Sequence, residues 1–200
     1  FAKGNVLVLE KDKNLKIKKD KIKGIKFFII KYRVIYNLYI YTYMTLIKNI
    51  SGFRGTIGGE NSENLTPLDI VNSIAAFSIL IKENNPNLSD LSVMTGRDGR
   101  KSGESILNIV NSVFSSMGID VIDCGISTTP TLCWVVLNNK SVAGLMITAS
   151  HNPEEYNGLK FFNSDGEFLS REDVNKLIKY SNLDSFDFSS NDGLGKVTKY

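Results

Sequence analysis

An alternation of helix-length and strand-length apolar segments between Thr66 and Ile147 limits the possible folds more than any other feature. Apolar residues recur at helical spacing after Thr66 and again after Gly103, and each such stretch is followed by a short run of strand length. The last run, Val142–Ile147, is apolar throughout, which is typical of a strand buried on both faces. Strands and helices that alternate in this way predict a layered α/β domain with a largely parallel sheet.

Capping signals mark the ends of the expected helices. Thr66 before Pro67, with Asp69 three residues after the threonine, predicts a helix start with a capping box. Thr129 followed by Pro130 predicts a second start of the same kind. Similar signals bound two more helices: one ends at Gly118, and another runs from the cap Ser170 to about Tyr180.

Two short β-type segments flank a turn signal nearer the carboxyl end. Leu159–Phe162 and Glu167–Leu169 lie on either side of Asn-Ser-Asp-Gly, so we expect an antiparallel hairpin at one edge of the sheet. The full expectation is a three-layer α/β/α domain with a mostly parallel mixed sheet and an edge hairpin. Residues 182–200 are polar and are expected to form an exit linker.

The first 48 residues differ in composition from the rest. They carry 12 Lys and Arg against 3 Asp and Glu, a net of 12 − 3 = +9, whereas residues 49–200 carry 12 against 18, a net of −6. A lysine run followed by tyrosines can bind nucleic acid or an anionic membrane, but no nucleic-acid-binding motif accompanies it. We therefore expect residues 1–43 to be a basic, poorly structured or non-native extension, with Met44 as a candidate start. A packed peripheral element and a functional basic arm that binds nucleic acid are the alternatives.

Several functional classes find no support in the sequence. Cys124, Cys133 and the single histidine, His151, do not have the paired spacing of a zinc site. The stretch Phe27–Ile47 is interrupted by charged residues and falls short of the roughly 18 apolar residues that a membrane span needs. Two cysteines on core-like segments fit a reduced, cytoplasmic protein. We expect neither nucleic acid nor membrane among its partners.

The residues that carry chemistry follow the buried run Val142–Ile147. The next segment, Thr148–Phe162, reads TASHNPEEYNGLKFF and places Ser150 and His151 at the carboxyl end of the strand, where open α/β sheets bind ligands. A serine hydrolase is disfavoured, because His151 is adjacent to the serine and no second histidine can act as the base. The simple alternative is a polar turn without chemistry.

Lys160 and Arg54 are the other candidate site residues. Lys160 lies between two apolar residues, so on an alternating strand it faces away from them and toward a cleft. Partial burial, or a cation such as Arg54, would lower the pKa of Lys160 toward that of a proton acceptor. The alternative is a solvent-facing lysine on an edge strand. Arg54 belongs to SGFRGTIGG, Ser51–Gly59, which we expect to be a flexible anion-binding loop.

Three segments in this order, SGFRG, GRDGRKSG and TASHNP with YNGLK, closely resemble the first domain of the α-D-phosphohexomutase superfamily. The resemblance extends from about Met44 to Tyr180 and places the expected domain at residues 44–181. It implies that Ser150 carries a phosphoryl group, that Lys160 is the general acid/base, and that His151 and Arg54 lie beside the transferred group.

The same resemblance includes GRDGR, residues 96–100. Asp98 can pair with either Arg97 or Arg100 within its own loop, so we expect the motif to have a structural role.

The resemblance also implies a reaction and its requirements. A hexose phosphate would be isomerised through a hexose bisphosphate, in two phosphoryl transfers that depend on positioning and charge. Mg²⁺ would be held by the Ser150 phosphate and by aspartates of a DGDxDR loop from another domain, and this loop does not occur in the 200 residues. We therefore expect a fragment that is inactive alone and is completed by the remaining mutase domains. A catalytically inactive phosphate-binding or interaction domain is the alternative.

Overall fold

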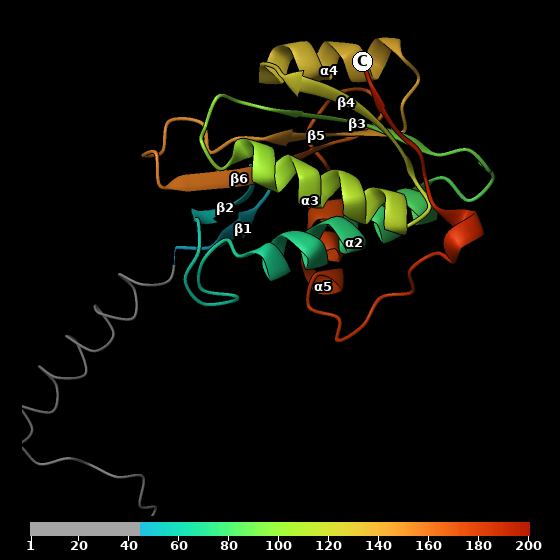
Figure 1. The fold of residues 1–200 in the computed structure, drawn as a ribbon. Helices are drawn as coiled ribbons and strands as arrows, with labels where there is room; N and C mark the ends of the chain where they lie inside the picture. Colours follow the sequence, from blue (N-terminus) through green and yellow to red (C-terminus); the bar gives the residue numbers. More distant parts are fainter. Residues whose placement is uncertain (1–44) are drawn as a thin grey trace, which may run out of the picture. The chain divides into compact units, whose positions relative to one another are not determined.

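The computed structural model describes residues 45–200; the basic extension up to residue 43 and the candidate start Met44 lie outside the described residues. These residues form a seven-stranded sheet with helices on both faces (Figure 1). The strands are β1 (Ile47–Asn49), β2 (Gly52–Thr56), β3 (Ser92–Arg97), β4 (Asp120–Ile126), β5 (Ala143–Ile147), β6 (Tyr156–Phe162) and β7 (Val197–Lys199). The helices are α2 (Pro67–Asn84), α3 (Gly103–Ser116), α4 (Thr129–Asn138), α5 (Arg171–Tyr180) and the 3-10 helix η2 (Asn191–Gly193).

The sheet has both parallel and antiparallel halves. Its strand order is β1-β2-β6-β5-β3-β4-β7. Strands β5, β3, β4 and β7 pair in parallel, whereas the β1–β2, β2–β6 and β6–β5 pairs are antiparallel. The α/β class and the layered architecture are confirmed, with three parallel pairings and three antiparallel ones rather than a mostly parallel sheet.

The expected edge hairpin is reduced to a tight turn. Strand β6 lies inside the sheet between β2 and β5, and the following segment pairs with it only through the bridge from Phe168 to Phe162. The turn is held by the Asn163 side chain, which accepts hydrogen bonds from the backbone N–H groups of Asp165 and Glu167. The chain then leaves at once for the cap of α5, so no second strand forms.

The glycine-rich stretch around Arg54 is a strand, which corrects the expectation of a flexible loop. Phe53 is fully buried, and β2 pairs with both β1 and β6. The two glycines within β2 serve close packing rather than flexibility, because a Cβ on Gly55 would lie 3.0 Å from the backbone nitrogen of Leu65.

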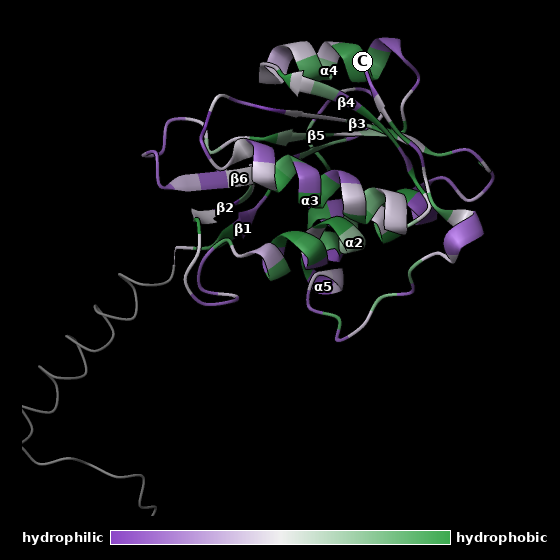
Figure 2. Cartoon of the chain, in the orientation of Figure 1, coloured by the Kyte–Doolittle hydropathy of each residue, from purple (hydrophilic) through white to green (hydrophobic). Residues whose placement is uncertain are grey.

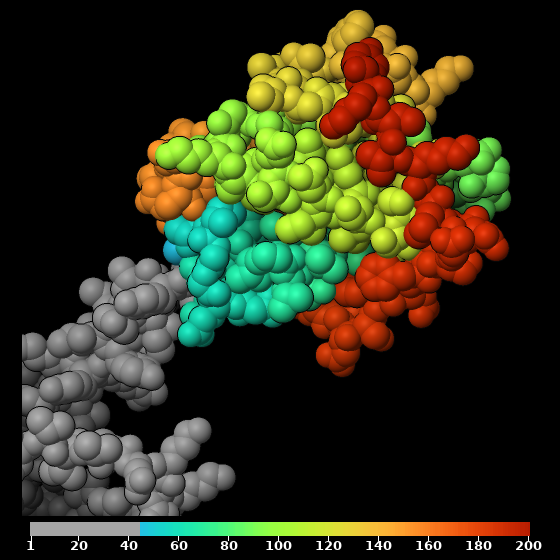
Figure 3. All heavy atoms as spheres, viewed as in Figure 1, coloured from blue at the N-terminus to red at the C-terminus, as the bar shows by residue number. Residues whose placement is uncertain are grey.

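The segment after Asn182, expected to be an exit linker, returns to the sheet. Strand β7 pairs in parallel with β4, and in the space-filling view the C-terminal residues run along the outside of the domain (Figure 3). The Lys199 ammonium pairs with the buried carboxylate of Asp123, which also accepts a hydrogen bond from Asn111. A buried carboxylate needs such partners, and this need favours the docking of β7.

Two apolar clusters bind the helices to opposite faces of the sheet. Alternate side chains of β5 and β6, such as Leu145 and Phe161, pack against α2, α3 and α5. Their neighbours Met146 and Phe162 face the other way and pack against α4. Figure 2 shows the corresponding hydrophobic colouring along β5. No helix within residues 45–200 is long and apolar enough to cross a membrane.

The helix caps largely follow the sequence signals. The capping box of Thr66 and Asp69 is present at α2, and Ser170 caps α5. At α4 the cap is Thr128, one residue earlier than predicted, because its hydroxyl accepts a hydrogen bond from the N–H of Thr131.

Candidate functional site

The site is built where two parallel strands end side by side. Strands β3 and β5 are neighbours, so the loops that follow them leave the sheet at the same edge. The loop after β3 carries GRDGR, and the loop after β5 carries Ser150. A backbone hydrogen bond of 3.0 Å from the Asp98 N–H to the Ile147 oxygen extends the strand pairing into the loops.

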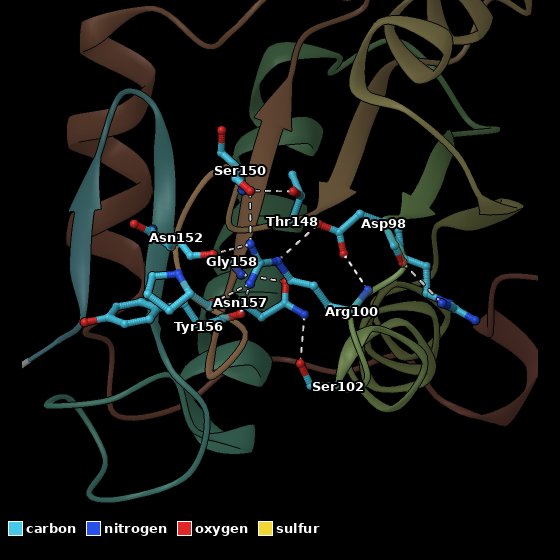
Figure 4. Close-up of polar contacts among 11 residues, drawn as sticks. Asp98, Arg100, Ser102, Thr148, Ser150, Asn152, Tyr156, Asn157 and Gly158 are labelled. Atoms are coloured by element: carbon cyan, nitrogen blue, oxygen red, sulfur yellow. Dashed lines mark hydrogen bonds and ion pairs between the residues drawn. The ribbon is translucent and has the colours of Figure 1, made fainter.

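Arg100 binds the serine loop from inside. Its guanidinium donates to four backbone carbonyl oxygens, drawn in Figure 4: those of Ser150 (3.0 Å), Asn152 (2.7 Å), Pro153 (2.6 Å) and Tyr156 (2.9 Å). Its Nε also pairs with the Asp98 carboxylate at 3.3 Å, and its side chain is only 13% exposed. The structural role predicted for GRDGR thus extends beyond its own loop, because Arg100 determines the path of the loop that carries the serine.

Ser150 stands at the tip of this loop in an unusual backbone conformation. Its φ of 59° lies in the left-handed region, which non-glycine residues seldom adopt. Its N–H donates to the Thr148 hydroxyl at 3.0 Å, and the residue itself is exposed. His151 is exposed in the same turn. Backbone strain of this kind is held by surrounding contacts, here chiefly those of Arg100, and is common at functional sites.

Gly158 joins the serine loop to the strand that carries Arg54. Its oxygen accepts a hydrogen bond from the Thr148 N–H at 3.0 Å, and it lies opposite Arg54 in the β2–β6 pairing. A Cβ at this position would lie 2.6 Å from the Arg54 Cγ and 2.9 Å from the Thr148 oxygen. Only glycine therefore allows the loop, β6 and the Arg54 side chain to approach so closely. The Asn157 side chain donates a hydrogen bond of 2.9 Å to the hydroxyl of Ser102, the residue just before α3 (Figure 4).

Lys160 is half-buried on β6 and faces the α4 side of the sheet. It alternates with the buried Leu159 and Phe161 as predicted, and because β6 is an interior strand, the edge-strand alternative is wrong. Burial lowers the pKa of Lys160, the positive charge of Arg54 lowers it further, and Cys133 opposes them. The structure thus brings Arg54 and Lys160 together. No hydrogen bond joins the described side chains of Ser150 and Lys160.

An open hollow of about 520 Å³ lies between the two loops. Its walls come from Asp98, Gly99, Arg100, Lys101, Asn152 and Glu154. Lys101 and Glu154 form an exposed ion pair of 2.8 Å across it. Neither Ser150 nor Lys160 lines this hollow, so it flanks the serine loop on the Arg100 side and is not the place where those two groups would act.

The described residues do not by themselves fit a divalent metal site. Within residues 45–200 no group of three or more His, Cys, Asp or Glu side chains is arranged to hold a metal ion. The two carboxylates that line the hollow are both engaged, Asp98 by Arg100 and Glu154 by Lys101. Any metal at Ser150 would need most of its ligands from outside these residues.

The sequence matches the family described as phosphoglucomutase/phosphomannomutase, alpha/beta/alpha domain I, over residues 46–187. The chain belongs to this family. Members of this phosphohexomutase family use Mg²⁺ and bind hexose phosphates.

Named relatives of this phosphohexomutase domain agree with the match. The chain is 36% identical over 154 residues to phosphoglucosamine mutase of Levilactobacillus brevis, and 40% identical over 154 residues to that of Leuconostoc mesenteroides. Each alignment covers 74% of this chain and 34% of the relative, so the chain spans about a third of the length of these proteins.

Solved structures share the fold. A chain from Thermus thermophilus has a TM-score of 0.63 at 24% identity, covering 78% of this chain and 33% of that one. A phosphoglucomutase/phosphomannomutase family protein from Burkholderia thailandensis has a TM-score of 0.59 at 24% identity, covering 75% of this chain and 32% of that one.

Three residues in or beside the candidate site make contacts that the sequence did not reveal. The contacts of Arg100 with the serine loop depend on β3 and β5 being neighbours, and one sequence does not reveal strand order. The need for glycine at position 158 depends on the approach of Arg54 from β2. Phe168 was predicted only as part of a hairpin, although its ring lies beside Lys160. An exposed aromatic residue soon after the lysine was the only available clue.

Proposed function

We propose that this chain is the phosphoserine-bearing domain of an enzyme that interconverts hexose 1- and 6-phosphates through a hexose bisphosphate. The observation that carries the proposal is the environment of Lys160. It is half-buried beside Arg54, with a lowered pKa, on the strand that directly follows the exposed serine loop. Membership of the phosphoglucomutase/phosphomannomutase family supports phosphoryl transfer as the chemistry of these groups.

In the first transfer, a sugar hydroxyl attacks the phosphorus of phosphorylated Ser150. The new sugar O–P bond forms while the bond between phosphorus and the serine Oγ breaks, with its electron pair remaining on Oγ. Neutral Lys160 takes the proton of the attacking hydroxyl, and the exposed Oγ takes up a proton from solvent. A lowered lysine pKa increases the neutral fraction near neutral pH, which general base catalysis requires.

The second transfer runs in the opposite sense. The Ser150 hydroxyl attacks the other phosphate of the reoriented bisphosphate and releases its proton to solvent, while the bond from that phosphorus to the sugar oxygen breaks. The Lys160 ammonium returns its proton to the sugar oxygen. Arg54, next to Lys160, would stabilise the negative charge on the moving phosphoryl group, and His151 would lie beside the phosphoserine.

The domain supplies only part of such a site. The phosphate on Ser150 would be one metal ligand, and the remaining mutase domains would supply the other ligands and the sugar contacts. We therefore expect negligible isomerisation by residues 1–200 alone. The relatives named phosphoglucosamine mutase favour a glucosamine phosphate as the substrate to test first, with glucose and mannose phosphates for comparison.

Intact-mass spectrometry tests the proposal on this chain. After incubation with glucosamine 1,6-bisphosphate and Mg²⁺, we expect the chain to gain one phosphoryl group, mapped to Ser150 by fragmentation. Ser150→Ala should abolish the gain, and Lys160→Met should slow it by about 10²-fold or more, as the loss of a general acid does. Lys101→Met, an exposed lysine nearby, serves as the matched control and should react like the parent. A folded chain that never gains a phosphoryl group would instead favour a non-catalytic phosphate-binding or interaction domain.

A further inference from the structure

We propose that Phe168 is a positioning residue that holds the Lys160 side chain in place on the α4 face of β6. The inference rests on the proposed role of Lys160 as the proton carrier. The Lys160 Nζ lies 5.8 Å from the centre of the Phe168 ring, within the range of a cation–π contact. Phe168 is 45% exposed, so its ring is not fully used by the core.

The Phe168 ring is itself held in place. It packs on the buried Phe162 ring with centroids 5.1 Å apart, and its backbone bridges to Phe162. Gly166, in the turn before Phe168, has a φ of 72°. A Cβ at this position would clash with the backbone oxygen of Cys133 in α4. The turn therefore packs directly against α4. This packing restricts the position of the Phe168 ring beside Lys160.

The ring and Arg54 act on the ammonium in opposite directions. The face of an aromatic ring attracts a cation, whereas the guanidinium of Arg54 repels it. A flexible lysine beside an arginine would otherwise turn toward solvent. Attraction to Phe168 holds the ammonium near the site while it carries the proton between the two transfers. The groups that face Lys160 are Arg54 from β2, Cys133 from α4 and Phe168 from the turn.

Titration of Lys160 by NMR tests this contact without any need for turnover. Lysine labelled with ¹³C at Cε reports the charge of each ammonium, and Lys160→Arg identifies the Lys160 signal. Phe168→Leu keeps apolar cover over the lysine but removes the aromatic face. We expect the pKa of Lys160 to fall by about half a pH unit in this variant, since an exposed cation–π contact has about that effect.

Two further variants make the result specific. Phe168→Tyr keeps the aromatic face and should restore the parental pKa. Phe188→Leu makes the same change at a second exposed phenylalanine, which contacts Phe186, and should leave the Lys160 titration unchanged. An unchanged or raised pKa of Lys160 in Phe168→Leu would overturn the proposal, because the ring would then only shield the lysine from solvent, as leucine does.

The experiment separates this inference from the proposed function. A lowered pKa with rescue by tyrosine supports the contact even where Ser150 gains no phosphoryl group, and in that case the contact is retained while the non-catalytic alternative is favoured. Phosphorylation of Ser150 with an unresponsive Lys160 titration would refute the role of Phe168 alone.

Discussion

Replacement of Arg100 by methionine tests whether this residue holds the serine loop together. The guanidinium donates to four loop carbonyl oxygens at 2.6–3.0 Å and pairs with Asp98, while its side chain is 13% exposed. At about 1.5 kcal/mol for each charge-assisted hydrogen bond, the four together would contribute about 6 kcal/mol. Water can reach the freed carbonyl groups of an exposed loop, and such contributions do not add fully. We therefore expect Arg100→Met to lower the free energy of unfolding by about 3 kcal/mol.

Urea and thermal unfolding measure this loss. For a domain of this size, about 3 kcal/mol corresponds to a fall in melting temperature of roughly 6–12 °C. Hydrogen exchange should quicken at the backbone N–H groups of residues 150–156, because the loop loses its internal support. Arg100→Lys should recover part of the stability, since an ammonium keeps the charge but lacks the planar fork of donors.

Lys101→Met is the matched control for this prediction. Lys101 is the next residue, and its ion pair with Glu154 is exposed on both sides, so its removal should change unfolding little. Arg100→Met within about 1 kcal/mol of the parent, with unchanged exchange in the loop, would refute the reasoning. The loop would then be held by its own turns rather than by the arginine.

Three further changes test the packing and electrostatics of the site. Gly158→Ala should destabilise the domain by about 2–3 kcal/mol, because the new Cβ meets Arg54, the Phe53 oxygen and the Thr148 oxygen below 3.0 Å; an alanine variant as stable as the parent in urea would show that these contacts relax freely. Arg54→Met should raise the pKa of Lys160 toward its ordinary value of 10.5, since removal of a neighbouring positive charge favours the ammonium; an unchanged Lys160 pKa in the NMR titration described above would show that Arg54 does not repel the ammonium. Ser150→Gly should be more stable than Ser150→Ala by about 1 kcal/mol, because both lack the hydroxyl but only glycine is relaxed at a positive φ; equal melting temperatures would argue against strain at this position.

The fold could be predicted to the extent that it depends on local pattern. The capping box of Thr66 and Asp69, the cap at Ser170 and the fully buried β5 are all where the apolar spacing and polar caps indicate. Predictions that needed strand order or pairing were less successful. β6 lies inside the sheet, and the glycine-rich segment at Arg54 is a strand, because pairing partners distant in sequence override local flexibility.

The candidate site likewise combines residues that could be predicted from local sequence with contacts that depend on strand pairing. Ser150, His151, Lys160 and Arg54 were proposed from residue type and motif, and the alternation around Lys160 correctly indicated that its side chain faces away from Leu159 and Phe161. The effect of Arg54 on the pKa of Lys160 was also expected, but the contacts of Arg100 with the serine loop and of Phe168 with Lys160 were not.

By itself, the sequence determined the family, the candidate site residues and the helical and strand segments of the domain, because these follow from residue type, motif and the spacing of apolar residues. Only the tertiary structure decided that β3 lies beside β5 and β2 beside β6. Those two pairings bring Arg100 under the serine loop and Arg54 next to Lys160. The physical reason is that strand pairing joins segments separated by dozens of residues, and the contacts that select one order over another act only once the sheet is assembled.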